Sequence, residues 1–394
     1  MSAFFIFLEI IGIATLVPVA IGSLYLALIT LAGSLPGRRC AAQPLGGRLA
    51  VVVPAHDEAA GIGRCLDNLA RLACLDGATE VVVVADNCSD DTAAIARAAG
   101  ARVLERMDPA RRGKGHALDH AFKALAAEDH VAYLVIDADS QASAPTLGEI
   151  RRHFGAGALA LQTRYTVANG SATPRTKLAE IALAAFNVLR PRARDRLGLS
   201  VGILGNGFAL RREVLQRVPY TAASVVEDLE YHLRLVAAGI RVEFVDGAEI
   251  RGEMPTGDQG SRAQRARWEG GRLRMLLEHG PALAGAVLRG QWRRLEPLAD
   301  LLLPPLAYHV MLLLAALVLL ASLTGSGSML AGAGLLIVVL HVLAAMRVAG
   351  LPWSRLWSLY RVPLYLAWKL RILAATFAGA ARGSAWIRTD RNGS

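Results

Sequence analysis

The chain has 394 residues, of which 54% are hydrophobic and 19% charged, and its formal net charge is +10. Its mean hydropathy of +0.37 excludes an ordinary soluble protein, because so apolar a composition is typical of chains with bilayer-spanning segments.

The first apolar segment, Ile10 to Pro36, has no charged residue and is followed at once by Arg38 and Arg39. A helix needs roughly 20 residues to cross the hydrocarbon, so this segment is long enough. A cleaved signal peptide is the alternative, but the segment lacks a basic start and a clear Ala-x-Ala site. We therefore expect residues 1–37 to be a retained membrane anchor.

Residues 48–280 alternate short β-branched runs with alanine-rich helical stretches. The runs are 49–53, 81–84 and 131–136, and the helical stretches are 62–72, 92–99 and 116–126. This alternation predicts parallel strands covered by helices on both faces, the doubly wound α/β fold. Ligands bind at the carboxyl ends of the strands in such sheets, so the functional residues are expected just after each run.

Polar residues do collect after each predicted strand. The three segments are Pro54-Ala55-His56-Asp57-Glu58, Asp86-Asn87-Cys88-Ser89-Asp90-Asp91 and Asp137-Ala138-Asp139-Ser140. Asp90 or Asp91 is expected to cap the helix that begins at Thr92, which leaves Asp86 as the predicted ligand contact of its segment. A dinucleotide-binding oxidoreductase would need a Gly-x-Gly-x-x-Gly turn after the first strand, and this chain has none there.

Asp137 and Asp139 lie two residues apart in an extended segment, so both carboxylates can face one site. Carboxylates combined with phosphate oxygens are the usual ligands of hard divalent cations. An isolated Asp-x-Asp occurs often by chance, and the strand in front of it is what makes this one informative.

Two further motifs lie on predicted helices. Glu227 and Asp228 open a helix over 229–238, where acids are also favoured by the helix dipole alone. Gln264, Arg267 and Trp268 share one helical face. Arg267 can pair with diphosphate oxygens, Gln264 can hydrogen-bond them, and Trp268 offers a flat surface to a sugar ring. The alternative for this second motif is an amphipathic interfacial helix.

The segment from Leu301 to Met346 is uncharged and too long for one span, so we expect a helical hairpin over 301–347 that turns at 324–328. An interfacial amphipathic segment over 281–300 would precede it. Basic residues flank all the spans: Arg38, Arg39, Arg289, Arg293, Arg294 and Arg347. The positive-inside bias places these flanks in the cytoplasm, which requires three crossings.

The basic and aromatic tail, 348–394, is typical of a segment on an anionic membrane surface. No recognition motif accompanies its charge, so no nucleic acid is expected as a partner. Residues 364–377 are a possible fourth span, against which Lys369 and Arg371 argue. The four cysteines show no Cys-x-x-Cys spacing and are expected to be free thiols.

In this order, Asp-x-Asp at 137–139, Glu227-Asp228 and Gln-x-x-Arg-Trp at 264–268 resemble a membrane-bound family 2 glycosyltransferase of GT-A fold, over residues 49–268. The resemblance implies a domain of this fold inserted between transmembrane helices, and the inverting transfer of a sugar. The donor would be a nucleotide sugar, with a UDP-sugar as the one expected in this family, and the acceptor a glycan or a lipid-linked molecule. The setting would be the cytoplasmic face of a bacterial inner membrane.

The resemblance also implies roles for individual residues. Asp228 would be the base, and Asp139 with Asp137 would hold Mg²⁺ or Mn²⁺. The implied donor-side residues are Pro54, Glu58, Asp86, Lys114, Asp137, Gln264 and Arg267, and the implied acceptor-side residues are Gly205, Asn206, Gly207, Glu227 and Trp268. Lys114 lies in a Gly-Lys-Gly turn that can equally be a solvated loop. His56 departs from the family's Asn and is expected to be a hydrogen-bonded structural group.

Three alternatives stay open. A processive polysaccharide synthase, favoured by Gln-x-x-Arg-Trp and by the Trp386–Arg391 ending, would need an export partner or a dimer, because three spans are few for a channel. A non-catalytic membrane scaffold would have no need to keep all the acidic and basic motifs. A transporter is disfavoured because the three predicted spans contain no charged residue.

Overall fold

The structure, a computed structural model, describes residues 3–37, 40–221, 224–321 and 325–381. Arg38, Arg39, Thr324 and the Trp386–Arg391 ending, on which sequence-based expectations rest, lie outside the described residues.

The described elements follow the predicted alternation of strands and helices between long apolar helices. The strands are β1 Arg48–Ala55, β2 Thr79–Asp86, β3 Arg102–Arg106, β4 His130–Val135, β5 Ser140–Ala142, β6 Ala160–Val167, β7 Phe208–Arg211 and β8 Val242–Gly252. The helices up to β8 are α1 Ala3–Ser34, α2 Ile62–Asp76, α3 Thr92–Ala98, α4 Lys114–Leu125, α5 Thr146–Gly155, α6 Pro174–Ala184, a π-helix Ala185–Leu189, α7 Arg190–Arg196, α8 Arg212–Arg217 and α9 Glu227–Ala237. After β8 come α10 Asp258–Leu288, a 3₁₀ helix Trp292–Arg294, α11 Leu295–Leu302, α12 Leu306–Ala321, α13 Gly325–Ala349, a 3₁₀ helix Trp353–Arg361 and α14 Val362–Ala381.

The strands form one sheet in the order β3-β2-β1-β4-β7-β6-β8-β5. β1 pairs in parallel with both β2 and β4, which confirms the doubly wound arrangement predicted for these strands. β7 runs antiparallel to β4 and β6, and β5 runs antiparallel to β8, so the second half of the sheet is mixed. The sequence pattern did not indicate this mixed half.

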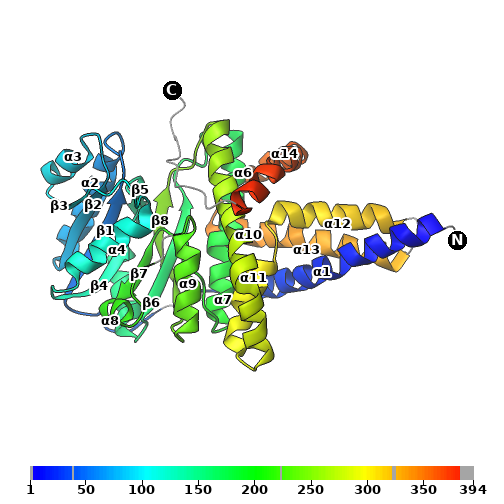
Figure 1. Cartoon of the computed structure of the whole chain (residues 1–394), viewed down its shortest axis with the longest axis horizontal. Helices are drawn as coiled ribbons and strands as arrows, with labels where there is room; N and C mark the ends of the chain where they lie inside the picture. Colours follow the sequence, from blue (N-terminus) through cyan, green and yellow to red (C-terminus); the bar gives the residue numbers. More distant parts are fainter. Residues whose placement is uncertain (1–2, 38–39, 222–223, 322–324, 382–394) are drawn as a thin grey trace.

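Helices cover the sheet on both faces (Figure 1). Val51 and Val53 face a core completed by α2 and α5, while Val52 faces one completed by α4 and α9. Because both faces are covered, the middle of β1 is buried residue after residue instead of alternately. Burying each large aliphatic side chain contributes roughly 1.5–3 kcal/mol, which fixes the strand ends that carry the polar residues.

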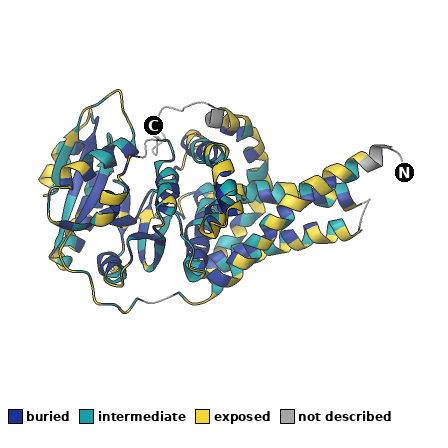
Figure 2. Ribbon diagram, turned by 60° about the horizontal axis from the view of Figure 1, so that its bottom comes forward, coloured by how far each residue is buried: buried dark blue, intermediate teal, exposed yellow. Residues whose placement is uncertain are grey.

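A helical arm projects from this domain. Helices α1, α12 and α13 run side by side, and α6, α7, α10 and α11 lie between the arm and the sheet (Figure 1). Large apolar side chains on the arm face outward, including Leu24 at 72% and Val318 at 73% exposure (Figure 2). An exposed apolar belt of this kind matches a bilayer's hydrocarbon better than water.

Two helices are long and apolar enough to cross a membrane, Phe7–Ser34 and Ser326–Ala349. A third span is possible if α11 and α12, bent by 73° at their junction, form one crossing. Among the described residues α14 is not such a helix. Two expected boundaries differ from the structure. Gly325 begins α13 instead of lying in the turn, and α10 continues through Pro281, across the expected domain limit at 280.

Candidate active site

The polar strand ends meet at the carboxyl edge of the sheet, beside the point where the chain passes from one side of β1 to the other. Asp86 ends β2, and Asp137 and Asp139 lie between β4 and β5. The crevice outside this switch point is where open α/β sheets bind ligands. The predicted grouping of these residues is therefore present.

Lys114, the first residue of α4, reaches into this edge. Its Nζ donates to the carboxylate of Asp137 and to the carbonyl oxygen of Gly205, 2.6 Å away. Burial alone would lower the pKa of Lys114, but the carboxylates of Asp137, Glu227 and Asp228 raise it above its usual value. Lys114 is thus a fixed cation of the site and not part of a solvated loop.

Asn206 ties the Asp-x-Asp segment to the loop that precedes β7. Its Oδ1 accepts from the backbone N–H of Asp137 at 3.2 Å, and its Nδ2 donates to Ser140 Oγ at 2.8 Å. Ser140 Oγ in turn donates to Asp139 Oδ1 at 3.0 Å. The Asn206 side chain is buried and makes both of these bonds, so in this structure it orients the two aspartates.

The glycines beside Asn206 allow a close approach to Asp228. Gly205 and Gly207 have φ angles of 78° and 72°, a region that favours glycine. A Cβ on Gly205 would lie 3.1 Å from Asp228 Oδ2, and one on Gly207 would lie 2.2 Å from Thr163 Oγ1. The loop therefore contacts Asp228 on one side and Lys114 on the other.

Glu227 and Asp228 form the first turn of α9, as the sequence predicts. Burial raises the pKa of both carboxyls, and burial together with the charge of Asp228 raises the pKa of Glu227 to about 7. Lys114 and Arg267 oppose this rise. A carboxylate with a raised pKa accepts a proton more readily, which suits a general base.

Helix α10 brings the Gln-x-x-Arg-Trp motif to the same edge. Arg267 lies close enough to lower the pKa values of Glu227 and Asp228, and Gln264 is buried. Trp268 packs instead against an apolar cluster centred on Met254, and the Arg265 guanidinium lies 5.6 Å from its ring. The ring proposed as a sugar platform is thus partly used in packing.

The residues after β1 and β2 hold one another in place. Asp86 Oδ1 accepts from Arg106 Nη1 at 2.6 Å, and His56 Nδ1 donates to the Asp86 carbonyl oxygen at 2.7 Å. His56 is thus hydrogen-bonded, as expected. Asp90 Oδ1 accepts from the N–H of Thr92, the first residue of α3, at 3.0 Å, whereas Asp91 at the N-cap position makes no side-chain capping bond. The structure also places Pro54 and Glu58 at this edge, both partly buried.

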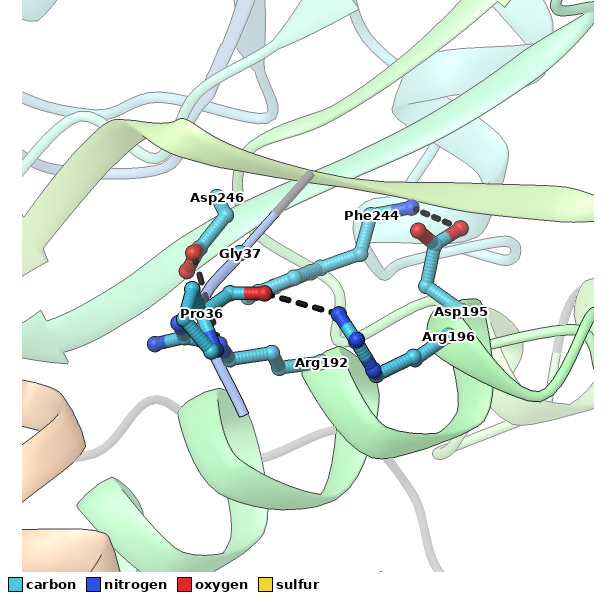
Figure 3. Close-up of a pocket in the computed structure, with 7 residues that line it drawn as sticks. All are labelled: Pro36, Gly37, Arg192, Asp195, Arg196, Phe244 and Asp246. Carbon is cyan, nitrogen blue, oxygen red and sulfur yellow. Dashed lines mark hydrogen bonds and ion pairs between the residues drawn. The ribbon is translucent and has the colours of Figure 1, made fainter. Parts of the chain in front are cut away.

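A polar cavity of about 230 Å³ adjoins Asp139. Gln141 of β5, Asn169 after β6 and Arg251 of β8 line it together with Asp139. A second, smaller cavity lies where the chain leaves α1, between α7 and β8 (Figure 3). There Arg196 Nη1 donates to the Pro36 carbonyl oxygen at 2.8 Å. Its volume of about 10 Å³ holds at most one water, so of these two cavities the one beside Asp139 is the roomier.

The metal-binding candidates differ in how their charges are balanced. Asp137 and Asp139 present the carboxylate oxygens that Mg²⁺ and Mn²⁺ accept. Glu80, Glu128 and His130 also lie close together, but Arg48 and Arg102 pair with the two glutamates at the opposite end of the sheet. The four cysteines are free thiols, as predicted.

A family model described as glycosyltransferase like family 2 matches residues 47–271. Over 243 residues the chain is 25% identical to a probable glycosyltransferase, YdaM, of Bacillus subtilis, which covers 59% of this chain and 56% of that protein. Over 240 residues it is 28% identical to the beta-monoglucosyldiacylglycerol synthase of Trichormus variabilis, covering 58% of this chain and 50% of that protein. The chain thus spans about half the length of these curated relatives.

Among solved structures, the mannosyltransferase PcManGT from Pyrobaculum calidifontis, in complex with GDP-Man and Mn²⁺, superposes with a TM-score of 0.58. The likeness covers 95% of this chain and 98% of that one at 21% identity, so it concerns the fold. The family model covers more than half of the chain and confirms both the predicted GT-A fold class and the predicted enzyme class. The chain belongs to the glycosyltransferase-like family 2.

Proposed function

We propose that the chain is a membrane-bound, metal-dependent inverting hexosyltransferase that uses a nucleotide-sugar donor, with a UDP-sugar as the first candidate. One observation carries this proposal. The Gly205 loop joins Asp228 to the donor-side residues, because its carbonyl oxygen accepts from Lys114 while its Cα borders the Asp228 carboxylate. A base and a diphosphate-binding cation thus lie against the same loop.

Asp228 would act as the base of a single displacement. It takes the proton of an acceptor hydroxyl, whose oxygen forms a bond to the anomeric carbon. The bond from that carbon to the diphosphate oxygen breaks on the opposite face, and the diphosphate leaves with both electrons. One such displacement inverts the anomeric configuration. The raised pKa of Asp228 favours the proton transfer.

The leaving diphosphate would lie against Lys114 and Arg267, with Asp137 and Asp139 on its other side. Mg²⁺ or Mn²⁺ bound by these two aspartates would neutralise charge on the leaving oxygens. The donor set fits such an ion, and PcManGT was solved with Mn²⁺ and a nucleotide sugar. Gln264 would complete the donor side from α10, and Pro54, Glu58 and Asp86 would contact the nucleoside.

The acceptor would enter from the membrane side, towards Gly207, Glu227 and Trp268. A lipid-linked or glycan acceptor is supported by the apolar arm and by the name of the diacylglycerol-glycosylating relative. The exposed Trp357 and Tyr360, at 81% and 70%, fit the interface between bilayer and cytoplasm. We place the chain in a bacterial inner membrane with its catalytic domain in the cytoplasm.

The direct test is donor consumption. Purified full-length chain in lipid nanodiscs is incubated with radiolabelled UDP- and GDP-hexoses, Mn²⁺ or Mg²⁺, and an inner-membrane lipid extract. One donor is expected to be consumed, with its label appearing in a product of inverted anomeric configuration by NMR. Consumption of none of these donors, or retention of configuration, would overturn the proposal. Long polymers in place of single additions would favour the processive alternative.

Topology is tested separately. A reporter fused after Ser394 is expected to be active in the cytoplasm, and one inserted after Ser326 is expected to report the periplasm, because arginine clusters flank the catalytic domain. Two reporters on the same side would contradict the hairpin. A reversed pair would separate the catalytic domain from its cytosolic donor.

A further inference from the structure

Helix α14 lies along the segment of α10 that carries the Gln-x-x-Arg-Trp motif (Figure 1). Side chains of α14 and of α6 both contact the first residue of α10. Trp368 Nε1 of α14 donates to Oδ1 of Asp258, the first residue of α10, at 3.2 Å. Arg175 of α6 donates to the same oxygen at 2.5 Å, with its guanidinium 5.5 Å from the Trp368 ring. The amino end of α10 is thus held between α6 and α14.

A buried ion pair makes the second connection. Lys369 of α14, 1% exposed, donates from Nζ to Glu269 Oε1 of α10. The Tyr308 hydroxyl of α12 donates to the other oxygen, Glu269 Oε2, at 3.2 Å. The rings of Tyr308 and Tyr365 lie 5.2 and 5.9 Å from the Lys369 ammonium. Both oxygens of one carboxylate therefore receive a donor, each from a different helix.

The placement of this pair matters because Glu269 directly follows Trp268 and lies two residues from Arg267. A continuous helix transmits a shift at Glu269 to Arg267 almost undiminished. Separating the two charges would leave each of them buried without a partner. The pair therefore strongly favours one packing arrangement of α14 and α12 against α10. An exposed pair would hold the helices far less firmly.

We propose that Glu269 and Lys369 are positioning residues for the sugar transfer. With Tyr308 they hold α10 where Arg267 faces Glu227 and Asp228, and so they set the cation that receives the leaving diphosphate. This inference rests on the proposed function. Both partners of Glu269 lie outside the matched family region, 47–271, so that region alone lacks part of what places its own arginine.

The test compares nucleotide binding in the full-length chain with and without the pair. Isothermal titration in nanodiscs with Mn²⁺ measures the affinities of UDP, GDP and UMP. Lys369→Met is expected to weaken binding of the diphosphate by about tenfold and that of UMP by less than about twofold, since Arg267 acts on the diphosphate. Lys369→Arg, which keeps the charge, is expected to recover most of the affinity. The matched control is Arg371→Met, an exposed cation of the same helix, which is expected to change neither affinity.

A second measurement does not depend on a ligand. Hydrogen–deuterium exchange of residues 262–271 is expected to rise in Lys369→Met and to stay unchanged in Arg371→Met. If Lys369→Met does not fold, Tyr308→Phe removes a single hydrogen bond and is expected to show the same pattern at a smaller size, about threefold for the diphosphate.

The outcomes separate the two proposals. A wild-type chain that binds neither UDP nor GDP overturns the proposed function, and the positioning role falls with it. Wild-type binding with an unchanged affinity and unchanged exchange in the variants overturns the positioning role alone. Equal losses for UDP and UMP would also overturn it, because they would mark a general structural defect.

Discussion

Two clusters of buried charge, one at the sheet edge and one at the junction with the arm, differ in how their charges are balanced. At the sheet edge the carboxylates of Asp137, Glu227 and Asp228 face two cations, Lys114 and Arg267. Negative charge is in surplus there, and burial raises the pKa values of the α9 carboxyls.

At the junction, each carboxylate has a guanidinium. Arg194 of α7 pairs with Glu296 at 2.5 Å and with Asp300, both on α11. Arg272 of α10 pairs with Asp300 Oδ2 at 3.0 Å. The Tyr25 hydroxyl of α1 accepts from Arg194 at 3.1 Å. This cluster joins α1, α7, α10 and α11, so it fastens the arm to the catalytic domain.

This difference distinguishes charged residues that stabilise the fold from charged residues that bind a ligand. Charges that are fully paired hold elements together, whereas a surplus of one sign is costly in a free site and is relieved by a ligand of opposite sign. The surplus of negative charge at the sheet edge favours the binding of a divalent cation. The paired charges at the junction favour a fixed interface between the arm and the catalytic domain. Four measurements test this contrast.

The largest expected effect comes from removing the cation or its ligand. Excess EDTA and the substitution Asp139→Asn are each expected to reduce donor turnover below detection, because the leaving diphosphate loses its counter-charge. Thermal unfolding of Asp139→Asn should match the wild type, since its partner Ser140 Oγ also donates to an amide oxygen. Full activity in excess EDTA would contradict a metal at the sheet edge.

Asp228→Asn is expected to reduce turnover by roughly 10²–10⁴-fold with little change in donor affinity, because a proton acceptor matters mainly in the transition state. Turnover and nucleotide-sugar affinity are measured on the same preparation. An equal loss of affinity would make Asp228 a binding residue, and the site would then lack its base.

The sheet edge was predictable because its signals are local. A β-branched run predicts a strand, the strand fixes where Asp137 and Asp139 emerge, and the apolar helices α2 and α4 close the two faces. The order of the motifs along the chain then indicated the resemblance to a GT-A glycosyltransferase. The mixed half of the sheet was not predictable, because a short strand such as β7 has no pattern that shows its direction.

The junction could not be predicted, because its partners are far apart in the sequence. Arg272 reads as one of several exposed arginines of an amphipathic helix, yet it is buried against Asp300. Lys369 reads as a charge that argues against a span, and its partner Glu269 lies 100 residues earlier. Only the folded chain shows which of these charges are paired.

The junction is tested by breaking one of its pairs. Arg194→Met is expected to destabilise the folded protein by roughly 3–5 kcal/mol, because it leaves the buried Glu296 carboxylate uncompensated. The matched control is Arg274→Met, which removes an exposed i,i+4 pair with Glu278 and is expected to cost at most about 0.5 kcal/mol. Denaturant unfolding in detergent, followed by tryptophan fluorescence, measures both. Equal small effects would show that the junction is no more structural than the surface.

The smallest expected effect is a shift in the pH dependence of turnover when one of the α9 carboxylates is removed. Burial raises the pKa of both α9 carboxyls, and the pKa of Glu227 reaches about 7, so this acidic pair takes up a proton as the pH falls and gives it up as the pH rises. Only ionised Asp228 can accept the hydroxyl proton, so turnover at saturating donor is expected to decline as the pH falls through the raised pKa of Asp228. Glu227→Gln removes a neighbouring negative charge, which makes Asp228 easier to ionise and should move this decline to lower pH by about one unit.

The matched control for this shift is Glu230→Gln on the same helix, whose carboxylate accepts from the N–H of Ser224 at 3.2 Å. It is expected to leave the pH profile in place, because the charges of Asp228 and Glu227 interact whereas Glu230 is not among the main influences on the pKa of either carboxyl. A decline that stays where it was in Glu227→Gln, or moves to higher pH, would mean that the two α9 carboxyls do not share their charge. The surplus at the sheet edge would then not set the protonation state of the base.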